Sequence, residues 1–336
     1  MKRLILTSVA GADLAKSKLA EIVVLFFFRF MWGPLPSPEY FAAYFGAQGT
    51  LKPGDHWSDW GPKWPSKFKE LRKLPFADFC ERHDEIELWF DPSPDDQLQL
   101  IWLLDHLACY PELLKKLGLR LVAFDLFDVR EKVSEASASH IRMVDVQARE
   151  LQTAGMAWQA YRAPTPEACA NVLHSDLSAL LILRSAWQQL LGELPSPLTG
   201  LGASEMRFLE MLARGYANAN ALFHLRSLRG TYVFGEFELG SLLEGLALGP
   251  KPAVAGLGDE LRTIDPEDLG ARHDDAIRHA RYKQSRMSLT DLGKAVLAGD
   301  QDFLQHNPIH RWVGGTLLTN ERLWRWDRES RLLVAP

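Results

Sequence analysis

The chain has 336 residues, of which 47% are hydrophobic and 24% are charged, as in a typical soluble globular protein. A chain of this length is expected to form about two domains, each with its own core. The formal net charge of -5 provides no general attraction to nucleic acid or anionic membranes, although a local basic face could still contact DNA. The three cysteines are widely spaced and form no CxxC pair, so we expect reduced thiols and no zinc site.

The amino-terminal segment predicts neither a signal peptide nor a membrane anchor. Its apolar run, LILTSVA, is short and is followed closely by Asp13, Lys16 and Lys18. The most apolar run, residues 22–32, is well below the roughly 20 residues that a spanning helix needs. Its β-branched and aromatic residues favour a strand buried on both faces. We therefore expect a cytosolic protein.

Strands and helices alternate in the first part of the chain. We predict strands at residues 4–9, 21–28, 85–90 and 120–127. One predicted helix starts after Ser37, with Pro38 at its first position. A long apolar helix is predicted from Pro94 to about residue 117, with an interruption near Pro111. Strands separated by helices predict a parallel, Rossmann-like sheet that is covered on both faces. Residues 1–129 are therefore expected to be an α/β domain, with any ligand crevice outside the carboxyl ends of its strands.

The pattern changes after residue 129. Helical periodicity in residues 134–163, and in the segments TPEACANVL and DLSALLILRSAWQQLLGEL, predicts a helical linker region at 130–196. The segment PSPLTGLG, residues 195–202, is the clearest boundary. Beyond it, helices precede two β-like stretches, RWVGGTLL and RLWRWD, in an order that resembles a winged helix-turn-helix domain. We predict a winged-helix-like domain at 197–336, which could contact either protein or DNA.

The segment SPDDQLQL, residues 93–100, has two interpretations. Ser93 can cap a helix that begins at Pro94, and Asp96 is placed to complete a capping box with a side chain shorter than the usual Glu. Asp95 and Asp96 also lie in the first turn, where the helix dipole stabilises a negative charge by about 0.3–1 kcal/mol. Helix capping does not account for the presence of Asp91, which lies before the helix. The alternative is that Asp91 and Asp96 belong to a ligand or metal site at the end of the preceding strand.

Several phrases of the sequence together resemble one bacterial family. They are EIELWF followed by DDQLQL, then WQAYRAPTPEA, TGLGASEMRFLEML, IHRWVGG and WRWD, with MWGPLPS nearer the amino terminus. The chain is similar over most of its length to the family catalogued as domain of unknown function 1835. The phrase LWF followed by DQLQL is the most specific part of the resemblance.

The chain departs from the family pattern where members carry polar groups. Members often have Gly-Asp after the first strand, an acidic residue near the end of the second, and His-Asp after LWF. The positions that differ here are Thr7, Ser8, Phe28, Pro92 and Ser93. Asp91, Asp96 and Gln97 match. The resemblance implies a site at the strand ends, and the missing polar groups make catalysis less expected in this divergent member.

Three other groups of residues each have a structural and a functional interpretation. His306 and His310 have a metal-ligand spacing, but Pro308 lies between them and no third ligand is evident, so no metal site is predicted. A second group could form a solvated helix face or a phosphate-binding face. It comprises Arg278, Arg281, Lys283 and Arg286. The third group could cover a domain or stack on a base or sugar. It comprises Trp57, Trp60 and Trp64.

We expect a cytosolic bacterial binding or regulatory protein whose candidate partners are a small polar ligand and another protein, with no membrane association. The candidate ligand-binding residues are Ser8, Asp91, Asp95, Asp96 and Gln97. One alternative is a metal-assisted hydrolase or transferase in which Asp91 and Asp96 are metal ligands or general acid and base. Another is a DNA-binding regulator. No cofactor is indicated, since phosphate-loop, dinucleotide, nucleophile-elbow and HExxH motifs are absent from the sequence.

Overall fold

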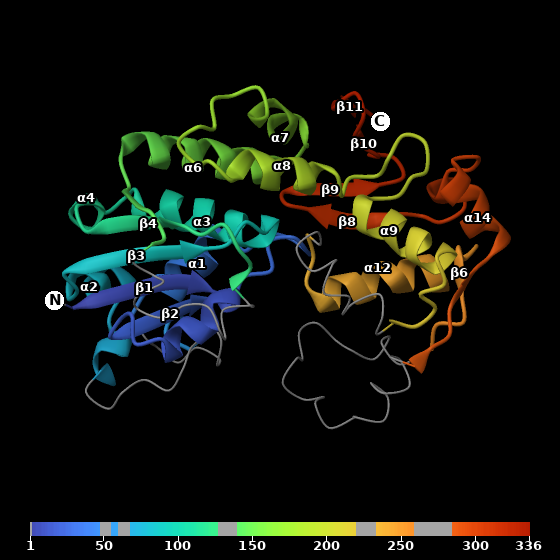
Figure 1. Cartoon of the computed structure of the whole chain (residues 1–336). Helices are drawn as coiled ribbons and strands as arrows, with labels where there is room; N and C mark the ends of the chain where they lie inside the picture. Colours follow the sequence, from blue (N-terminus) through green and yellow to red (C-terminus); the bar gives the residue numbers. More distant parts are fainter. Residues whose placement is uncertain (1, 48–54, 60–67, 127–139, 220–232, 259–283) are drawn as a thin grey trace. The chain divides into compact units, whose positions relative to one another are not determined.

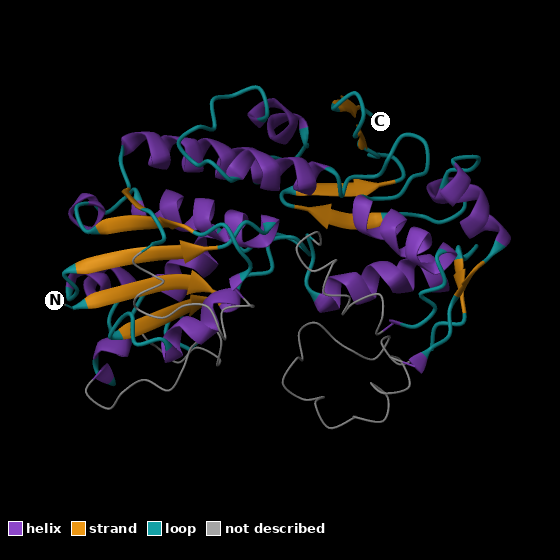
Figure 2. Ribbon diagram, in the orientation of Figure 1, coloured by secondary structure: helices purple, strands orange, loops and turns teal. Residues whose placement is uncertain are grey.

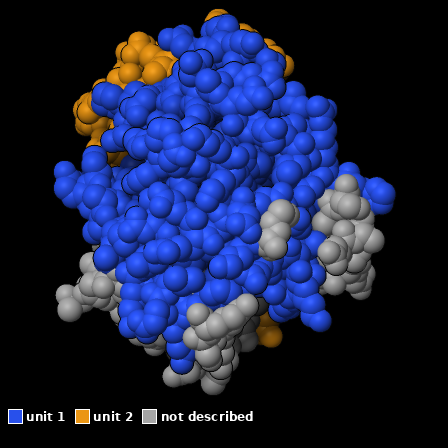
Figure 3. All heavy atoms as spheres, turned by 90° about the vertical axis from the view of Figure 1, so that its left-hand side faces the viewer, with its two compact units in different colours: residues 1–164, 171–187 blue, residues 165–170, 188–336 orange. Residues whose placement is uncertain are grey.

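The computed structural model of the chain describes residues 2–47, 55–59, 68–126, 140–219, 233–258 and 284–336. The chain forms two compact units, one of residues 1–164 and 171–187 and the other of residues 165–170 and 188–336 (Figure 3). The segment predicted as a linker region, 130–196, contributes to both units. Helix α6 (Ala148–Tyr161) belongs to the first unit because it packs along α3 (Pro94–Leu107). Its Tyr161 hydroxyl also donates a hydrogen bond to the Phe30 carbonyl at 3.0 Å.

The first unit is built on a mostly parallel sheet, which confirms the predicted α/β architecture (Figures 1 and 2). Among the described residues the strand order is β2-β1-β3-β4-β5. Four parallel strands are β1 (Arg3–Ser8), β2 (Ile22–Phe26), β3 (Glu85–Phe90) and β4 (Leu117–Leu121). The fifth, β5 (Met143–Asp145), runs antiparallel to β4.

The long helix predicted from Pro94 to about residue 117 is interrupted near Pro111, as expected. Helix α3 ends at Leu107, and a short α4 (Pro111–Leu114) follows, because Pro111 starts a new helix and cannot continue the old one. Strand β4 therefore begins at Leu117, ahead of the predicted start at 120. Strand β5 lies in a stretch predicted to be helical. It pairs with β4 where Gly118 has no side chain, so that Met143 can lie against the bare backbone.

One face of the sheet carries an aromatic core under α1 (Pro38–Phe45), α2 (Phe76–Glu81) and α3, which lie behind the sheet in Figure 1. Ser37 caps α1 as predicted, accepting a hydrogen bond from Tyr40 N at 3.2 Å. The Trp102 ring of α3 lies 5.5 Å from Phe26 and 5.3 Å from Phe45. Trp57 is fully buried in this core, whereas Trp60 and Trp64 lie outside the described residues. Aromatic side chains of this size account for much of the apolar surface buried by the unit.

The opposite face is covered by the 3-10 helix η1 (Val9–Lys16) and by residues 122–126. The sheet residues buried there are Ile5, Val23, Leu25 and Trp89. Ala10 and Leu14 of η1, with Val122 and Leu126, complete the cluster. The sheet is therefore covered on both faces, as its nearly continuous apolar strands predict.

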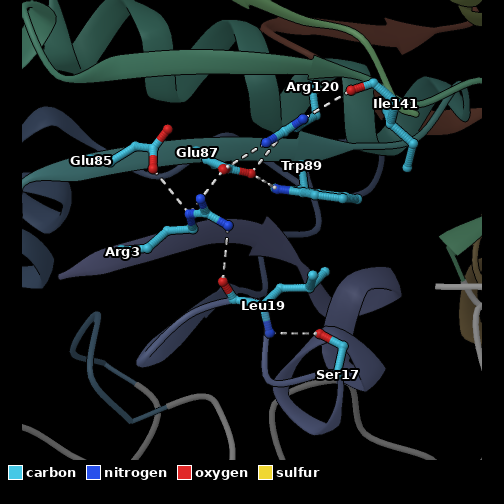
Figure 4. A network of polar contacts seen from close by, with 8 residues as sticks. All are labelled: Arg3, Ser17, Leu19, Glu85, Glu87, Trp89, Arg120 and Ile141. Carbon is cyan, nitrogen blue, oxygen red and sulfur yellow. Dashed lines mark hydrogen bonds and ion pairs between the residues drawn. The ribbon is translucent and has the colours of Figure 1, made fainter. Parts of the chain in front are cut away.

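Glu87, in the middle of β3, is a buried carboxylate on the η1 face (Figure 4). Arg120 of β4 binds it through two nitrogens at 2.8 and 2.9 Å, and Trp89 Nε1 donates at 2.8 Å. Arg3 of β1 lies 3.2 Å away, and Arg120 also donates to the Ile141 carbonyl. Burial tends to raise the pKa of Glu87, but the hydrogen bonds from Arg120 and Trp89 and the two positive charges bring it below its ordinary value. This network joins three strands and the segment before β5.

The second unit contains α9 (Ala203–Ala213), α12 (Glu236–Leu248) and α14 (Asp291–Ala298), with part of α7 (Glu167–Val172) and α8 (Leu183–Leu191). Its described strands form small antiparallel pairs. They are β6 (Val254–Ala255) with β7 (Ser288–Leu289), β8 (His310–Val313) with β9 (Thr316–Thr319), and β10 (Arg325–Asp327) with β11 (Leu332–Val334). These pairs do not by themselves confirm the predicted winged-helix domain. The 3-10 helix η6 (Phe303–Gln305) precedes β8, and η3 (Leu71–Lys73) belongs to the first unit.

Buried ion pairs also hold the second unit together. Arg311 of β8 binds the Glu205 carboxylate of α9 through two nitrogens at 2.6 and 3.2 Å. Glu193 accepts hydrogen bonds from the backbone and hydroxyl of Ser204, and burial raises its pKa to about 6. His306 and His310 do not share a helix, since His310 begins β8.

We predict that Arg120→Met lowers the free energy of unfolding by about 3 kcal/mol, because Glu87 loses its main ion-pair partner while it remains buried. Since the pKa of Glu87 is lowered in the folded protein, its stabilising contribution is present above pH 4.5 and is lost as the pH falls below that value. Urea denaturation at pH 7 and at lower pH measures both effects. The exposed Arg142→Met is the matched control and should change stability by under about 0.5 kcal/mol. Equal losses in the two variants would contradict the prediction.

Candidate functional site

The chain leaves β1 and β3, neighbours at the centre of the sheet, toward opposite faces. Helix η1 follows β1 and packs Leu14 on the face that carries Ile5. Helix α3 follows β3 and packs Trp102 against Phe26 on the other face. In doubly wound sheets with the strand order 2-1-3-4, ligands bind in the crevice at this switch point, outside the carboxyl ends of β1 and β3. The strand order therefore indicates where a ligand site of the first unit is expected.

Three predicted site residues meet at this point. Ser8 is the last residue of β1, and Asp91 directly follows β3. The Asp96 carboxylate accepts a hydrogen bond from the Asp91 backbone N–H at 2.8 Å, and the Ser8 side chain lowers the pKa of the same carboxyl. All three residues are at most 3% exposed. Tertiary structure thus joins the ends of two strands through Asp96, a residue in the first turn of α3.

The first turn of α3 contains only half of the predicted capping box. Ser93 caps the helix, accepting from Asp96 N at 3.4 Å. In a complete box the Asp96 side chain would accept from Ser93 N. Ser93 N donates instead to Asp91 Oδ1 at 2.8 Å, and Asp96 reaches back to Asp91 N. Two side chain–backbone hydrogen bonds therefore hold the turn: Ser93 N donates to the Asp91 carboxylate, and Asp91 N donates to the Asp96 carboxylate.

Asp91, which capping left unexplained, connects two strand ends. Its Oδ1 accepts from Ser93 N, and its Oδ2 accepts from Leu126 N at 3.2 Å. Leu126 belongs to the segment after β4 that covers the η1 face of the sheet. Both carboxylate oxygens of Asp91 are thus engaged by backbone N–H groups, and the side chain ties the end of β3 to a segment 35 residues further along the chain.

The remaining two predicted residues take different positions. Gln97 is buried beside Asp91 and donates from Nε2 to the Asp91 carbonyl at 2.7 Å. Asp95 is partly exposed, and its Oδ2 accepts from Gln99 Nε2 at 2.9 Å. Gln99 was not among the predicted site residues. Its position four residues after Asp95 on a helix is the signal that could have pointed to it.

Burial controls the protonation of the aspartate pair. It raises the pKa of Asp91, and hydrogen bonds from Ser93 and Leu126 offset only part of that rise. The pKa of Asp96 is raised well above its ordinary value, first by burial and then by the negative charge of Asp91. Two carboxyls in such contact titrate as a pair, because ionisation of one opposes ionisation of the other. Asp96 is the more readily protonated member of the pair.

Three further features of the described ranges bear on function: metal ligands, thiols and helices that could span a membrane. No group of three or more His, Cys, Asp or Glu side chains there is arranged to hold a metal ion. The three cysteines are free thiols. None of the described helices combines the length and the apolar character needed to cross a membrane.

Comparison with known proteins produced no match: no family model and no curated protein corresponds to the chain. The resemblance to domain of unknown function 1835 therefore stays a prediction.

We predict that Asp96→Asn stabilises the protein at pH 7 by about 1 kcal/mol or more, since the amide needs no proton to remain neutral when buried. A raised pKa means that the folded state holds the Asp96 proton more tightly than the unfolded state does. The wild type therefore loses stability as the pH rises from 3.8 toward the folded pKa, and the variant does not.

Denaturation curves recorded between pH 4 and pH 8 measure this difference. Asp145→Asn, at an exposed position of β5, is the matched control and should follow the wild type. Parallel curves for the wild type and Asp96→Asn would show that Asp96 is ionised throughout.

Proposed function

We propose that this protein is a binding or regulatory protein whose first unit takes a small polar ligand at the carboxyl ends of β1 and β3. The observation that carries the proposal is the pair of buried, coupled aspartates, Asp91 and Asp96, at the switch point of the sheet. Doubly wound sheets bind their ligands at this position. Buried ionisable groups with shifted pKa values are enriched at functional sites.

The hydrogen bonds of the pair fix both carboxyls against the backbone of the turn. A carboxylate oxygen has two lone pairs, so each engaged oxygen keeps one that can accept from a ligand. The oxygens of Asp91 accept from Ser93 N and Leu126 N, and Asp96 accepts from Asp91 N. The longest bond of Asp91, 3.2 Å from Leu126 N, is the one that a ligand with a donor group could replace. Replacement would release the segment after β4, which would couple ligand binding to a local change of structure.

Calorimetric titration of the full chain with polar metabolites and with Mg²⁺, Mn²⁺ and Ca²⁺ tests this proposal. We expect at least one ligand whose affinity falls about tenfold or more in Asp91→Asn and in Asp96→Asn, because Asp91→Asn removes the charge of the pair and Asp96→Asn removes its exchangeable proton. Asp145→Asn should bind as the wild type does. The absence of any ligand, or equal affinity in all four proteins, would overturn the proposal.

We further propose that the second unit is a winged-helix-like interaction module. The strand pairing around β7 supports this proposal. Strand β7 pairs with β6, and Arg286, which precedes β7, forms an antiparallel bridge with Asn218. Asn218 follows α9, and α12 lies between Asn218 and β6 in the chain. Three short antiparallel segments that alternate with helices in this order are what a winged-helix domain requires.

The charge of α12 favours a protein partner over DNA. This helix has the sequence EFELGSLLEGLAL, with three glutamates and neither lysine nor arginine. A helix that enters a DNA groove gains most of its affinity from basic groups near the phosphates, and the sequence of α12 contains none. Of the basic residues identified in the sequence, Arg278, Arg281 and Lys283 lie outside the described residues.

We predict that the protein does not retard a mixed-sequence DNA duplex in a gel at low salt, where phosphate contacts are strongest. Gly245 offers a matched pair of variants, because it is exposed on α12 and a Cβ added there meets no neighbouring atom. Gly245→Lys and Gly245→Glu should both leave DNA unbound. Binding that rises with Lys and falls with Glu would identify α12 as a DNA-contacting helix and contradict the prediction.

A further inference from the structure

Met143 of β5 fills the space that a glycine in β4 leaves empty. Gly118 has no side chain, and the Met143 Sδ lies 2.7 Å from the position that a Cβ at residue 118 would occupy. Strand β5 has three residues, lies at the edge of the sheet and pairs with β4 alone among the described strands. So short a strand forms few ladder hydrogen bonds, and the packing of Met143 on Gly118 adds to them.

The Met143 side chain is accessible to a dissolved oxidant. Met143 and Met156 of α6 are the exposed methionines of the described ranges, each with 37% of its surface in contact with solvent. Met31, Met211 and Met287 are at most 4% exposed. Because exposure governs which sulfur atoms are oxidised, Met143 and Met156 should react first. Met156 lies on a helix and serves as an internal comparison.

Oxidation changes the chemistry of the Met143 side chain. A hydroperoxide transfers one oxygen atom to the thioether: the O–O bond breaks, the S=O bond forms, and the peroxide leaves as water or an alcohol. The sulfoxide is polar, and burying its oxygen away from hydrogen-bond donors is costly. The N–H groups of β4 lie in the plane of the sheet and do not point at a side chain resting on its face.

The residue that faces Met143 across the ladder is already engaged. Arg120 directs Nε and Nη2 to the Glu87 carboxylate and Nη1 to the Ile141 carbonyl (Figure 4). The sulfoxide oxygen therefore gains its hydrogen bonds most readily from water, and the oxidised side chain turns away from Gly118. Loss of this contact weakens the pairing of β5 with β4.

Release of β5 extends to the segment before it. Ile141, two residues before Met143, packs on the apolar cluster that contains Val122 and Leu126. Its carbonyl accepts from Arg120 at 2.9 Å. Oxidation of one exposed sulfur thus loosens the edge of the sheet together with part of the cover of its η1 face.

We propose that Met143 is a redox-sensitive modification site of the first unit, and that its oxidation to the sulfoxide by a hydroperoxide releases β5 from β4. The inference is independent of the proposed function, since it concerns the edge of the sheet and not the carboxyl ends of β1 and β3. A methionine sulfoxide reductase, which takes its electrons from a dithiol, restores the thioether and releases water, so the change is reversible.

Amide hydrogen exchange of the full chain, measured by NMR before and after treatment with hydrogen peroxide, tests the proposal. The amides of Leu121 and Val146 donate hydrogen bonds across the β4–β5 ladder and report its opening. We expect their protection to fall about tenfold once mass spectrometry shows Met143 as the sulfoxide, and to recover on enzymatic reduction. Unchanged protection in the oxidised protein would overturn the proposal, as would a Met143 that stays reduced while Met156 is oxidised.

Met143→Leu and Met156→Leu separate this site from other oxidised groups. Leucine has nearly the volume of methionine and carries no sulfur. After peroxide treatment, Met156→Leu should lose protection at Leu121 and Val146 as the wild type does, whereas Met143→Leu should keep it. Both variants retain the exposed thiol of Cys109. Equal loss in the two variants would assign the effect to another site and contradict the proposal.

Gly118→Ala tests the contact without an oxidant. The added Cβ would lie 2.7 Å from the Met143 Sδ and displace the thioether. We expect the Leu121 and Val146 amides of the untreated variant to lose protection by about tenfold, as after oxidation. Protection equal to that of the wild type would show that the thioether does not hold β5 in place.

Discussion

The candidate site depends on the pairing of β1 with β2 on one side and with β3 on the other. Residues 4–8 of β1 pair in parallel with residues 22–26, and residues 3–7 pair with residues 85–89. After β2 the chain must therefore pass across β1 to reach the position of β3. The helices that follow β1 and β3 lie on opposite faces of the sheet. This topology brings Ser8 to the loop that contains Asp91 and leaves the first turn of α3 beside both. With β3 on the other side of β2, the same residues would be separated by a strand.

The first unit buries carboxylates in two physically different ways. Glu87 keeps its charge because Arg120, Arg3 and Trp89 supply positive charge and hydrogen bonds, so its pKa falls despite its burial. Within the described ranges, the groups that act on Asp91 and Asp96 are backbone N–H groups, hydroxyls and other aspartates, and burial raises the pKa values of both. A compensated carboxylate such as Glu87 stays ionised above pH 4.5, whereas a pair with raised pKa values responds to protons and to charged ligands. This contrast is why we place function at the aspartates and structure at Glu87.

Local sequence patterns correctly predicted most of the helices and strands whose ends are marked by a capping serine, a proline or the limit of an apolar run. Ser37 and Ser93 cap helices that begin with proline, and the apolar runs of β1, β2 and β3 are strands. The errors lie where a tertiary contact decided the outcome. Strand β5 has little strand character of its own and exists because β4 offers an open edge and a glycine for Met143 to cover. The capping box at Asp96 was half wrong because Asp91, a residue outside the helix, took the N–H that Asp96 was expected to bind.

The sequence by itself determined that the first part of the chain is a parallel α/β sheet and that Ser93 and Asp96 mark the start of a helix, because strand burial and helix capping depend on residues close together in the chain. The sequence also identified Asp91 as a candidate site residue but gave no structural role for its side chain. The tertiary structure alone decided that Ser8, Asp91 and Asp96 meet and that Leu126 N donates to Asp91. These facts depend on strand order and on contacts between segments up to 88 residues apart, from Ser8 to Asp96, and such contacts leave no periodic trace in the sequence.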